Sequence, residues 1–244
     1  MSLTLWTAAT PNGWKVSIML EELLGAGVEL PELEVRNVSL ADGEQFSDEY
    51  TALNPNQKIP TLVHDGRSIM ETGAILSYLG ETFPTSLLPL DEGKWEVLPW
   101  LYWQVANLGP VFGNKLSYTR YMPDVPVEQK VHPLERFNKE AQRLLSVMSN
   151  KLGDSRYLCG EDFTIADIAC YPWVRGYKWS KIDITLHPNI VAWVERVRER
   201  PGVERGLRYG MPEEETDRWN AETRARYARM GNSIASNDRL RSEQ

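Results

Sequence analysis

Over the first third of the chain, β-type runs alternate with amphipathic helical runs. Residues 3–7 are a short β-type run, and the turn formers Thr10-Pro11-Asn12-Gly13 follow it. Apolar side chains then recur three or four residues apart as far as Gly25, at Val16, Met19, Leu20, Leu23 and Leu24. This spacing is typical of a helix with one apolar face. The pattern therefore predicts a strand, a turn and a helix, in that order.

The next segments predict three more strands and a second helix. Residues 33–38 and 59–64 are β-type runs, and Asp65-Gly66 after the second run is a hairpin signal. Residues 67–70 are therefore expected to pair antiparallel with 59–64, and residues 72–83 to form a helix. The order βαβ followed by ββα predicts an α+β domain, with a small mixed sheet and helices packed on it.

The strand signals stop after a proline-containing segment. Residues 85–93 are predicted to be a linker between an N-terminal domain, residues 1–84, and an all-helical domain, residues 94–212. The helical domain opens with an aromatic-rich run that contains Pro99 and Pro110. Because proline lacks the N–H that a helix interior needs, each is expected to kink or interrupt the helix.

Three helical patterns follow in the second domain. Residues 126–152 carry an apolar stripe close to heptad spacing, and Gly153 after them is a C-cap candidate. The stripe consists of Leu134, Phe137, Ala141, Leu144, Leu145, Met148 and Leu152. The run Thr164-Ile165-Ala166-Asp167 has the form of a capping box that opens a buried helix. Residues 190–197 predict one more amphipathic helix, which stops at Pro201.

The C-terminal extension, residues 213–244, runs from acidic to basic composition. We expect one surface helix in it, around residues 217–230. The polar tail that follows is expected to be disordered.

Composition restricts the class of protein. Of 244 residues, 42% are hydrophobic and 25% are charged, which is enough apolar chain for a sizeable core. The 27 Lys and Arg residues against 34 Asp and Glu residues give a net charge of -7, which argues against nucleic acid as a partner. Neither a signal-peptide pattern nor a run of about 18 apolar residues occurs, so no membrane is expected. The two cysteines, Cys159 and Cys170, form no C-x-x-C motif, and the three histidines show no metal-ligand spacing. These observations predict a cytoplasmic protein without a metal.

The candidate chemistry lies in small polar clusters at the ends of the N-terminal elements. No Gly-rich phosphate loop, G-x-S-x-G, H-E-x-x-H or pair of catalytic carboxylates stands out. The first cluster is Thr10-Pro11-Asn12-Gly13. It can be simply a turn with a helix N-cap. Alternatively, its N–H groups and the Asn12 amide can donate to an anionic atom such as a thiolate.

Two further clusters have both a structural and a functional interpretation. In Asn56-Gln57-Lys58-Ile59-Pro60, a cis peptide before the proline would turn the Ile59 backbone outward to pair with an extended peptide ligand. The alternative is an ordinary loop-to-strand turn. Glu71 can cap its own helix, or it can bind a ligand ammonium while Thr72 and the helix N-terminus hold that ligand's carboxylate.

Taken together, the clusters resemble the glutathione transferase family. The segment NPNQKIPTLVHDGRSIMETGAILSYL resembles its glutathione half-site, and FTIADIA resembles its buried capping-box helix. The resemblance covers roughly residues 3–208. It implies a thioredoxin-like domain, a linker and an all-helical domain. Two more segments, TPNGWKVSIMLEEL and the later GEQF, resemble the nu-type bacterial enzymes and the fungal enzymes related to the nitrogen-regulation prion protein. This subgroup lacks the catalytic tyrosine, serine or cysteine of other classes.

The resemblance implies a role for each cluster in binding glutathione. Asn12 would contact the glutathione sulfur, with Thr10 beside it. The Ile59 backbone would pair with the cysteinyl moiety. Glu71 and Thr72 would hold the γ-glutamyl end.

Three more residues enter through the same resemblance. Gln45, in GEQF, would contact the tripeptide, and Arg136 would reach the glutathione site from the helical domain. Lys58 is a further candidate for the glycyl carboxylate. The wall beside the thiol is expected to be aromatic, with the candidates Trp14, Trp100, Trp103, Tyr118 and Trp173. The two cysteines are expected to be structural.

Two functional hypotheses follow. In the first, the chain is a cytoplasmic, homodimeric glutathione transferase that activates the glutathione thiol against a small electrophile, and also a glutathione-dependent disulfide reductase or peroxidase. In the second, it is a non-catalytic binding or regulatory protein on the same scaffold. No long Asn/Gln-rich segment precedes the first domain, which favours the enzyme over a prion-type regulator.

Overall fold

The N-terminal half of the protein is built on a four-stranded mixed sheet. The computed structural model describes residues 1–123 and 125–210. The strands are β1 (Ser2–Thr7), β2 (Glu32–Asn37), β3 (Thr61–His64) and β4 (Arg67–Met70), in the order β2-β1-β3-β4. Strand β1 pairs parallel with β2 and antiparallel with β3, and β3 pairs antiparallel with β4. The predicted thioredoxin-like arrangement is confirmed.

The predicted hairpin is present, and its turn has the backbone that the sequence demands. Asp65 and Gly66 both have positive φ, 48° and 80°. Such turns match the right-handed twist of paired strands, and glycine adopts them at little cost. Strand β3 begins at Thr61, two residues later than predicted, where its pairing with β1 starts.

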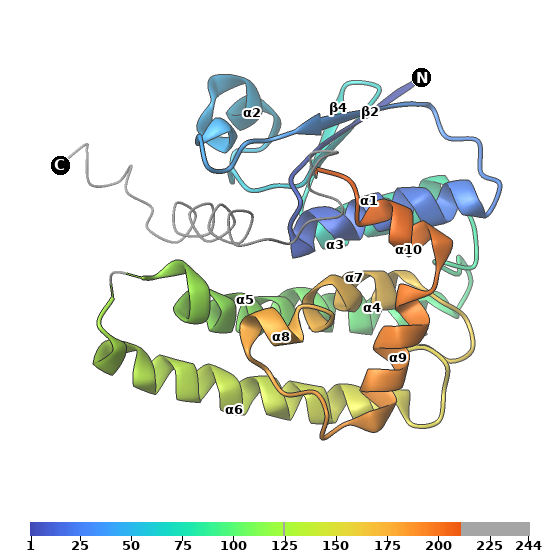
Figure 1. Cartoon of the computed structure of the whole chain (residues 1–244). Helices are drawn as coiled ribbons and strands as arrows, with labels where there is room; N and C mark the ends of the chain where they lie inside the picture. The colour runs from blue at the N-terminus through green and yellow to red at the C-terminus, as the bar shows by residue number, and fades with distance from the viewer. Residues whose placement is uncertain (124, 211–244) are drawn as a thin grey trace.

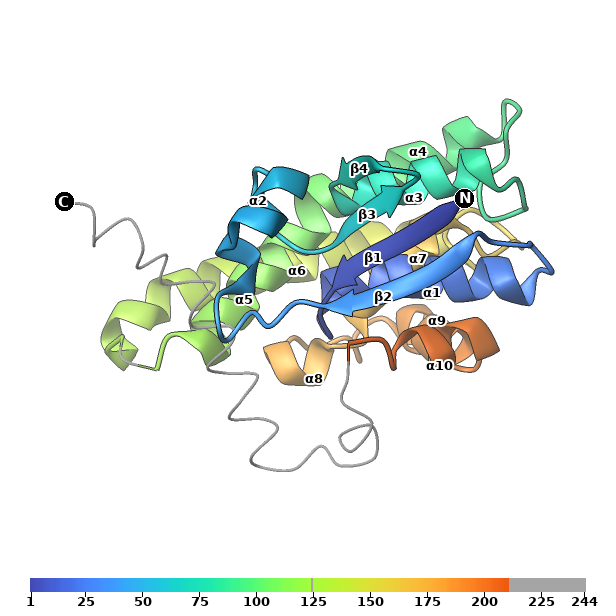
Figure 2. The ribbon, with the colours of Figure 1, turned by 90° about the horizontal axis from the view of Figure 1, so that it is seen from above.

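Two helices lie between the sheet and the helical domain (Figure 1). They are α1 (Pro11–Gly25) and α3 (Thr72–Thr82). Helix α1 contacts α3, and it also packs on helices α7 and α10 of the other half. It therefore has apolar neighbours on more than one side. Figure 2 shows the sheet covering α1 from above.

A short 3-10 turn and a short helix, which the sequence patterns did not predict, separate β2 from β3. They are η1 (Glu44–Phe46) and α2 (Asp48–Leu53). The Ser47 side chain caps α2 by accepting from the Tyr50 N–H. Both elements are shorter than two helical turns, so they show no measurable apolar periodicity.

The second half is entirely helical within the described residues. Its elements are α4 (Lys94–Trp103), η2 (Gln104–Leu108), α5 (Gly109–Leu116), η3 (Ser117–Tyr121), α6 (Val127–Leu152), α7 (Ile165–Val174), α8 (Tyr177–Ser180), α9 (Pro188–Arg198) and α10 (Pro201–Gly206). The segments η2 and η3 are π-helical. Long α6 runs along the side of the domain away from the sheet (Figure 1). The described elements confirm the all-helical prediction for this half.

The prolines of this half differ in their effects. Helix α4 continues through Pro99 without an interruption, against that part of the prediction. Pro110 stands at the start of α5, directly after π-helical η2, so the backbone pattern does change there. Pro201 opens the short helix α10, after α9 has ended at Arg198. Proline is well suited to the first turn, where its missing N–H costs nothing.

A single apolar cluster extends through both halves. It includes Leu5 of β1, Ile18 of α1 and Ile168 of α7, all fully buried. The predicted capping box is present: the Thr164 side chain accepts from the first turn of α7, and the Asp167 side chain accepts from the Thr164 N–H. The shared core fixes the two halves against each other, and with them the surfaces that face the space between.

Within residues 1–123 and 125–210, no helix is both long enough and apolar enough to cross a bilayer. The predicted extension, residues 213–244, and the helix expected around 217–230 lie outside the described residues.

Candidate active site

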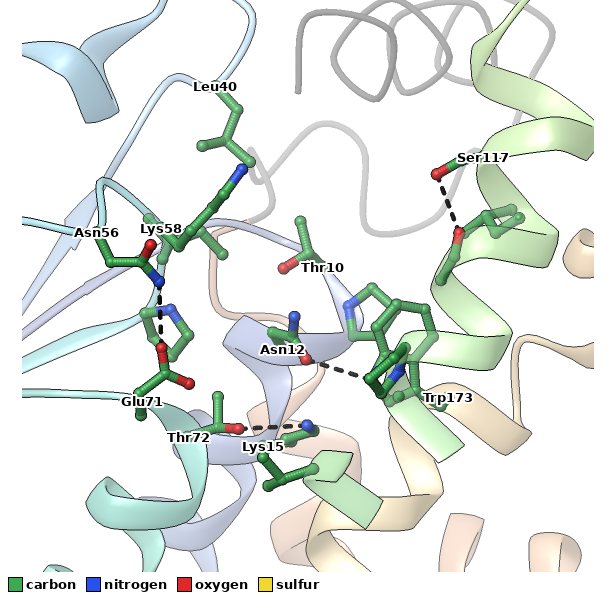
Figure 3. Close-up of a pocket in the computed structure, with 18 of the residues that line it drawn as sticks. Thr10, Asn12, Lys15, Leu40, Asn56, Lys58, Glu71, Thr72, Ser117 and Trp173 are labelled. Carbon is green, nitrogen blue, oxygen red and sulfur yellow. Dashed lines mark hydrogen bonds between the residues drawn. The ribbon is translucent and has the colours of Figure 1, made fainter. Parts of the chain in front are cut away.

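The candidate site is a cavity of about 600 Å³ between the two halves. This volume is in the range of small-molecule sites, roughly 300–1,000 Å³. Seven of the residues predicted for the site line it from the N-terminal half: Thr10, Asn12, Gln45, Lys58, Ile59, Glu71 and Thr72. The helical half contributes, among others, Gln104, Gly109, Gly113, Tyr121 and Trp173. Figure 3 shows these two walls facing each other.

The first cluster is both a helix cap and a wall of the cavity. The Thr10 hydroxyl accepts from the Gly13 N–H at 3.2 Å, which makes Thr10 the N-cap of α1. A hydroxyl that accepts one bond keeps its hydrogen for another. Thr10 can therefore donate into the cavity while it caps the helix. Gly13 must be small, since a Cβ there would lie 2.2 Å from the Ala8 carbonyl oxygen.

The orientation of the Asn12 amide is fixed from the helical half. Trp173 Nε1 donates to Asn12 Oδ1 at 3.2 Å (Figure 3). An indole N–H can only donate, so the atom that it contacts must be the amide oxygen. This leaves the two Nδ2 hydrogens of Asn12 for the cavity. Helix α1 adds its N-terminal dipole at the same place, which favours an anion.

The loop before β3 is held by two buried side chains that the sequence analysis missed. Tyr50 and Asn54 donate to the Lys58 carbonyl oxygen, at 2.9 and 2.7 Å, and both also bond to Thr61 Oγ1. These hydrogen bonds anchor the turn that leads into β3. The cis peptide bond expected between Ile59 and Pro60 is present. In the described part of the chain, the Ile59 main-chain N–H and C=O have no hydrogen-bond partner.

Glu71 opens α3 in a conformation that side chains rarely adopt. Its φ is 69°, and its side chain makes no cap hydrogen bond. Instead, Glu71 Oε1 accepts from Asn56 Nδ2 at 3.2 Å, at the edge of the cavity. A non-glycine residue at such a φ costs about 1–3 kcal/mol and tends to occur at functional sites. The predicted alternative of a self-capping carboxylate is therefore wrong.

A lysine that the sequence analysis did not single out lies at the foot of the cavity. Lys15 is 2% exposed, and its Nζ donates to Thr72 Oγ1 at 3.3 Å and to Gln104 Oε1 at 2.8 Å. Burial lowers the pKa of Lys15 to about 7, while the interactions with the Cys170 thiol and the Glu71 carboxylate act in the opposite direction. The lysine joins α1, α3 and η2 at one point, below Asn12 (Figure 3).

Gln45 and Lys58 differ in how firmly they are held. Gln45 is 2% exposed, and its Oε1 has no hydrogen-bond partner in the described structure, which leaves an acceptor for a ligand N–H. The Lys58 side chain is exposed and reaches over the cavity near Leu40 (Figure 3). Its charge can meet a ligand carboxylate at the rim.

The structure does not bring Arg136 to this cavity. Arg136 is exposed on α6 and is not among the lining residues. On that helix the buried face follows Ala141, Leu144 and Met148, and Arg136 lies off it. The helix is amphipathic, so its arginine faces outward.

Of the five aromatic wall candidates, Trp173 alone lines the cavity among the described residues. The other four pack elsewhere. Trp14 is 7% exposed, Trp100 and Trp103 form an edge-on pair, and Tyr118 stacks on Phe137.

Neither cysteine lines the cavity. Burial raises the pKa of the Cys159 thiol to about 11 and that of Cys170 well above its ordinary value. Since the thiolate is the reactive form, both side chains are poor nucleophiles near neutral pH. In the described ranges no group of three or more His, Cys, Asp or Glu side chains gathers as metal ligands do.

The structure joins a thioredoxin-like domain to a helical domain, with a cavity between them that both halves line. The family of the glutathione S-transferase N-terminal domain matches residues 1–81, and that of the C-terminal domain matches residues 111–201. The chain belongs to the glutathione S-transferase family.

Similar proteins lie in the subgroup that the sequence motifs resemble. The disulfide-bond oxidoreductase YfcG of Escherichia coli (strain K12) is 37% identical over 215 residues, which are 84% of this chain and 94% of that protein. The protein URE2 of Candida albicans is 27% identical, over 82% of this chain and 67% of its own length. A glutathione transferase structure from Pseudomonas putida, with one glutathione disulfide bound per subunit, has a TM-score of 0.75 and 33% identity, over 84% of this chain and 90% of that one.

Proposed function

We propose that this protein binds glutathione in the cavity and uses the glutathione thiolate to reduce disulfides. One observation carries the proposal: Asn12 has its amide hydrogens free at the start of α1, in a cavity that no cysteine of the described chain lines. The nucleophilic sulfur then comes from the ligand. Asn12 and Thr10 are its donors.

Donors of this kind are sufficient for the chemistry. A free thiol has a pKa of about 8.5, and lowering it by about two units requires roughly 2.7 kcal/mol of preferential stabilisation of the anion. A hydrogen bond to a charged group contributes about 1.5–3 kcal/mol, and a helix N-terminus adds about 0.3–1 kcal/mol. The Asn12 amide, the Thr10 hydroxyl and the dipole of α1 therefore supply the required amount.

The rest of the ligand extends along the N-terminal wall. The free main-chain groups of Ile59 pair with the cysteinyl residue as an added strand would. Glu71 accepts from the γ-glutamyl ammonium, and Thr72 donates to the neighbouring carboxylate. Gln45 contacts the tripeptide through its unpartnered Oε1. Lys58 meets the glycyl carboxylate at the rim.

Disulfide reduction then proceeds in two exchanges. The first glutathione thiolate attacks one sulfur of the substrate, forms a mixed disulfide and releases the other half as a thiolate. A second glutathione thiolate attacks the glutathione sulfur of the mixed disulfide, which releases the remaining half and forms glutathione disulfide. The two protons lost by the glutathione thiols neutralise the two released thiolates. The name of YfcG and the glutathione disulfide bound in the Pseudomonas putida relative support disulfide reduction as the activity.

A second activity, transfer of glutathione to an electrophilic carbon, uses the same thiolate. The helical wall of the cavity includes Val105, Pro110 and Leu116, which offer an apolar surface for such a substrate. The assembly that we propose is a homodimer, located in the cytoplasm. The dimer is supported by exposed apolar side chains on edge strand β4 and on α4. Met70, Trp95 and Tyr102 are 40%, 58% and 63% exposed.

The test is turnover of the full chain with glutathione and, in turn, a small mixed disulfide, a hydroperoxide and a chloronitrobenzene. We expect glutathione to be consumed fastest with the mixed disulfide, and Asn12→Ala to lose most of that rate. Binding of glutathione without turnover of any of the three would support the non-catalytic alternative instead.

A further inference from the structure

Lys15 is a buried charge without a counter-charge. Both of its hydrogen-bond partners, Thr72 Oγ1 and Gln104 Oε1, are neutral oxygens. Among the residues that the structure describes, no carboxylate makes an ion pair with Lys15. By contrast, the two buried carboxylates of the same helix, those of Glu21 and Glu22, are both paired with arginines. An unpaired buried ammonium is costly, so the missing negative charge calls for an explanation.

Among residues 1–123 and 125–210, two titratable groups act on the pKa of Lys15, Cys170 and Glu71. Cys170, in α7, has a pKa well above its ordinary value, so its thiol stays neutral. Glu71, before α3, acts at a distance and bonds to Asn56 instead. Gln104 of η2 is neutral. The protein itself therefore leaves the charge of Lys15 largely uncompensated while the cavity is empty.

The bonds of Lys15 also fix the direction of two other donors. An ammonium can only donate, so both oxygens that it contacts must accept. The Thr72 hydroxyl therefore keeps its hydrogen for another acceptor. The Gln104 amide presents its Nε2, which is buried and without a partner in the described structure. Both residues line the cavity, so the Thr72 hydroxyl hydrogen has an acceptor position there, while Gln104 Nε2 is buried beside it.

We propose that Lys15 is a positioning residue for the γ-glutamyl carboxylate of glutathione: its buried charge acts through the Thr72 hydroxyl and is completed by the carboxylate that the ligand brings. The inference rests on the proposed function. It adds a group from beneath the site that touches both halves of the protein, through Thr72 of α3 and Gln104 of η2. The ligand carboxylate thus supplies the negative charge that Lys15 lacks among the described residues.

Proton uptake on binding follows from this arrangement. Burial lowers the pKa of Lys15 to about 7 in the empty cavity, so near pH 7 about half of the lysines are neutral. A carboxylate beside Thr72 favours the ammonium and raises that pKa. Binding therefore draws up to about half a proton per site from solvent near pH 7. Below about pH 6 the lysine is charged with and without ligand, and the uptake disappears.

Calorimetry of S-methylglutathione binding in buffers of different ionisation enthalpy measures this uptake. The methyl group removes the ligand's own thiol proton from the balance. None of the three histidines, His64, His132 and His187, lines the cavity, so no histidine is in contact with the bound ligand there. We expect an uptake that is largest near and above pH 7 and absent below about pH 6.

Three variants test whether the proton is taken up by Lys15. Lys15→Met replaces the lysine with an uncharged, unbranched side chain one atom shorter, so we expect the uptake to vanish and the affinity to fall about tenfold. The matched control, Lys58→Met, makes the same change at the exposed rim and should keep the uptake, whatever its affinity. Gln104→Met tests the second partner and should shift the pH at which the uptake begins.

The outcomes separate this inference from the proposed function. Binding of S-methylglutathione by the unaltered chain without proton uptake overturns the role of Lys15 and leaves glutathione binding intact. Uptake that persists in a folded Lys15→Met protein overturns it as well. Absence of binding overturns the proposed function and this inference together. The measurement on the unaltered chain decides the question even where Lys15→Met does not fold.

Discussion

In the proposed mechanism the Asn12 amide activates the thiol, and the bond from Trp173 orients that amide. Trp173→Phe removes the Nε1 donor, which lies 3.2 Å from Asn12 Oδ1, and keeps an aromatic ring in its place. A neutral hydrogen bond of this kind contributes about 0.5–1.5 kcal/mol, which corresponds to about 0.4–1.1 pKa units. Without the bond, the Asn12 amide turns freely and presents its hydrogens to the sulfur only part of the time. The pKa of bound glutathione should therefore rise by about half a unit to one unit.

The pH dependence of kcat/KM shows this rise directly. We expect the ascending limb of the Trp173→Phe profile to move to higher pH, with a rate about three- to tenfold lower at acid pH and nearly unchanged at alkaline pH, where the thiol ionises unaided. Trp100→Phe is the matched control, since Trp100 packs on Trp103 away from the cavity. A folded Trp173→Phe protein with the unaltered profile would refute the role of Trp173 in orienting Asn12.

Three other results are expected. Glu71→Ala should weaken glutathione binding by about 2 kcal/mol in calorimetry, because the ligand ammonium loses its charged partner; an unchanged affinity would remove Glu71 from the site. Asp167→Asn should lower the free energy of unfolding by about 2–4 kcal/mol in urea titrations, because an amide cannot accept from Leu158, Thr164 and Trp193 together. Burial raises the pKa of Asp167 from 3.8 to about 6, so the native state binds this proton more tightly than the unfolded state does. The free energy of unfolding should therefore fall as the pH rises from about 4 to about 6, and the Asp167→Asn protein should not show this pH dependence. In sedimentation the chain should have twice the mass of one copy, and Tyr102→Glu should reduce it to one; a single-copy mass for the unaltered chain at micromolar concentration would contradict the dimer.

Local patterns predicted the long elements and the turns well. The apolar stripe on residues 126–152 predicted α6, and Asp65-Gly66 predicted the hairpin. Both predictions succeeded because apolar periodicity and turn preferences depend on residues close together in the sequence. The same patterns missed α2, α8 and α10, which are six residues or shorter. Elements of that length have too few apolar positions to define a period. They are fixed by the tertiary contacts around them.

The site was predictable where a short motif carries it and not where distant segments meet. Thr10 and Thr72 each follow from a local motif at a helix start. Lys15 was missed because periodicity marks one apolar face of α1, whereas this helix is covered on several sides and buries its lysine as well. The contact between Asn12 and Trp173 joins residues 161 positions apart, beyond any local pattern.

Ultraviolet titration of the thiolate in the glutathione complex tests the central claim, that the protein activates the ligand's sulfur through Asn12. We expect the bound thiol to ionise about two units below its free value of about 8.5. The Asn12→Ala complex should ionise about one to two units higher than the unaltered complex. The double variant Cys159→Ser, Cys170→Ser should keep both the low pKa and most of the disulfide-reductase rate. An inactive double-serine protein beside a normal Asn12→Ala protein would contradict the account, because the nucleophile would then belong to the enzyme.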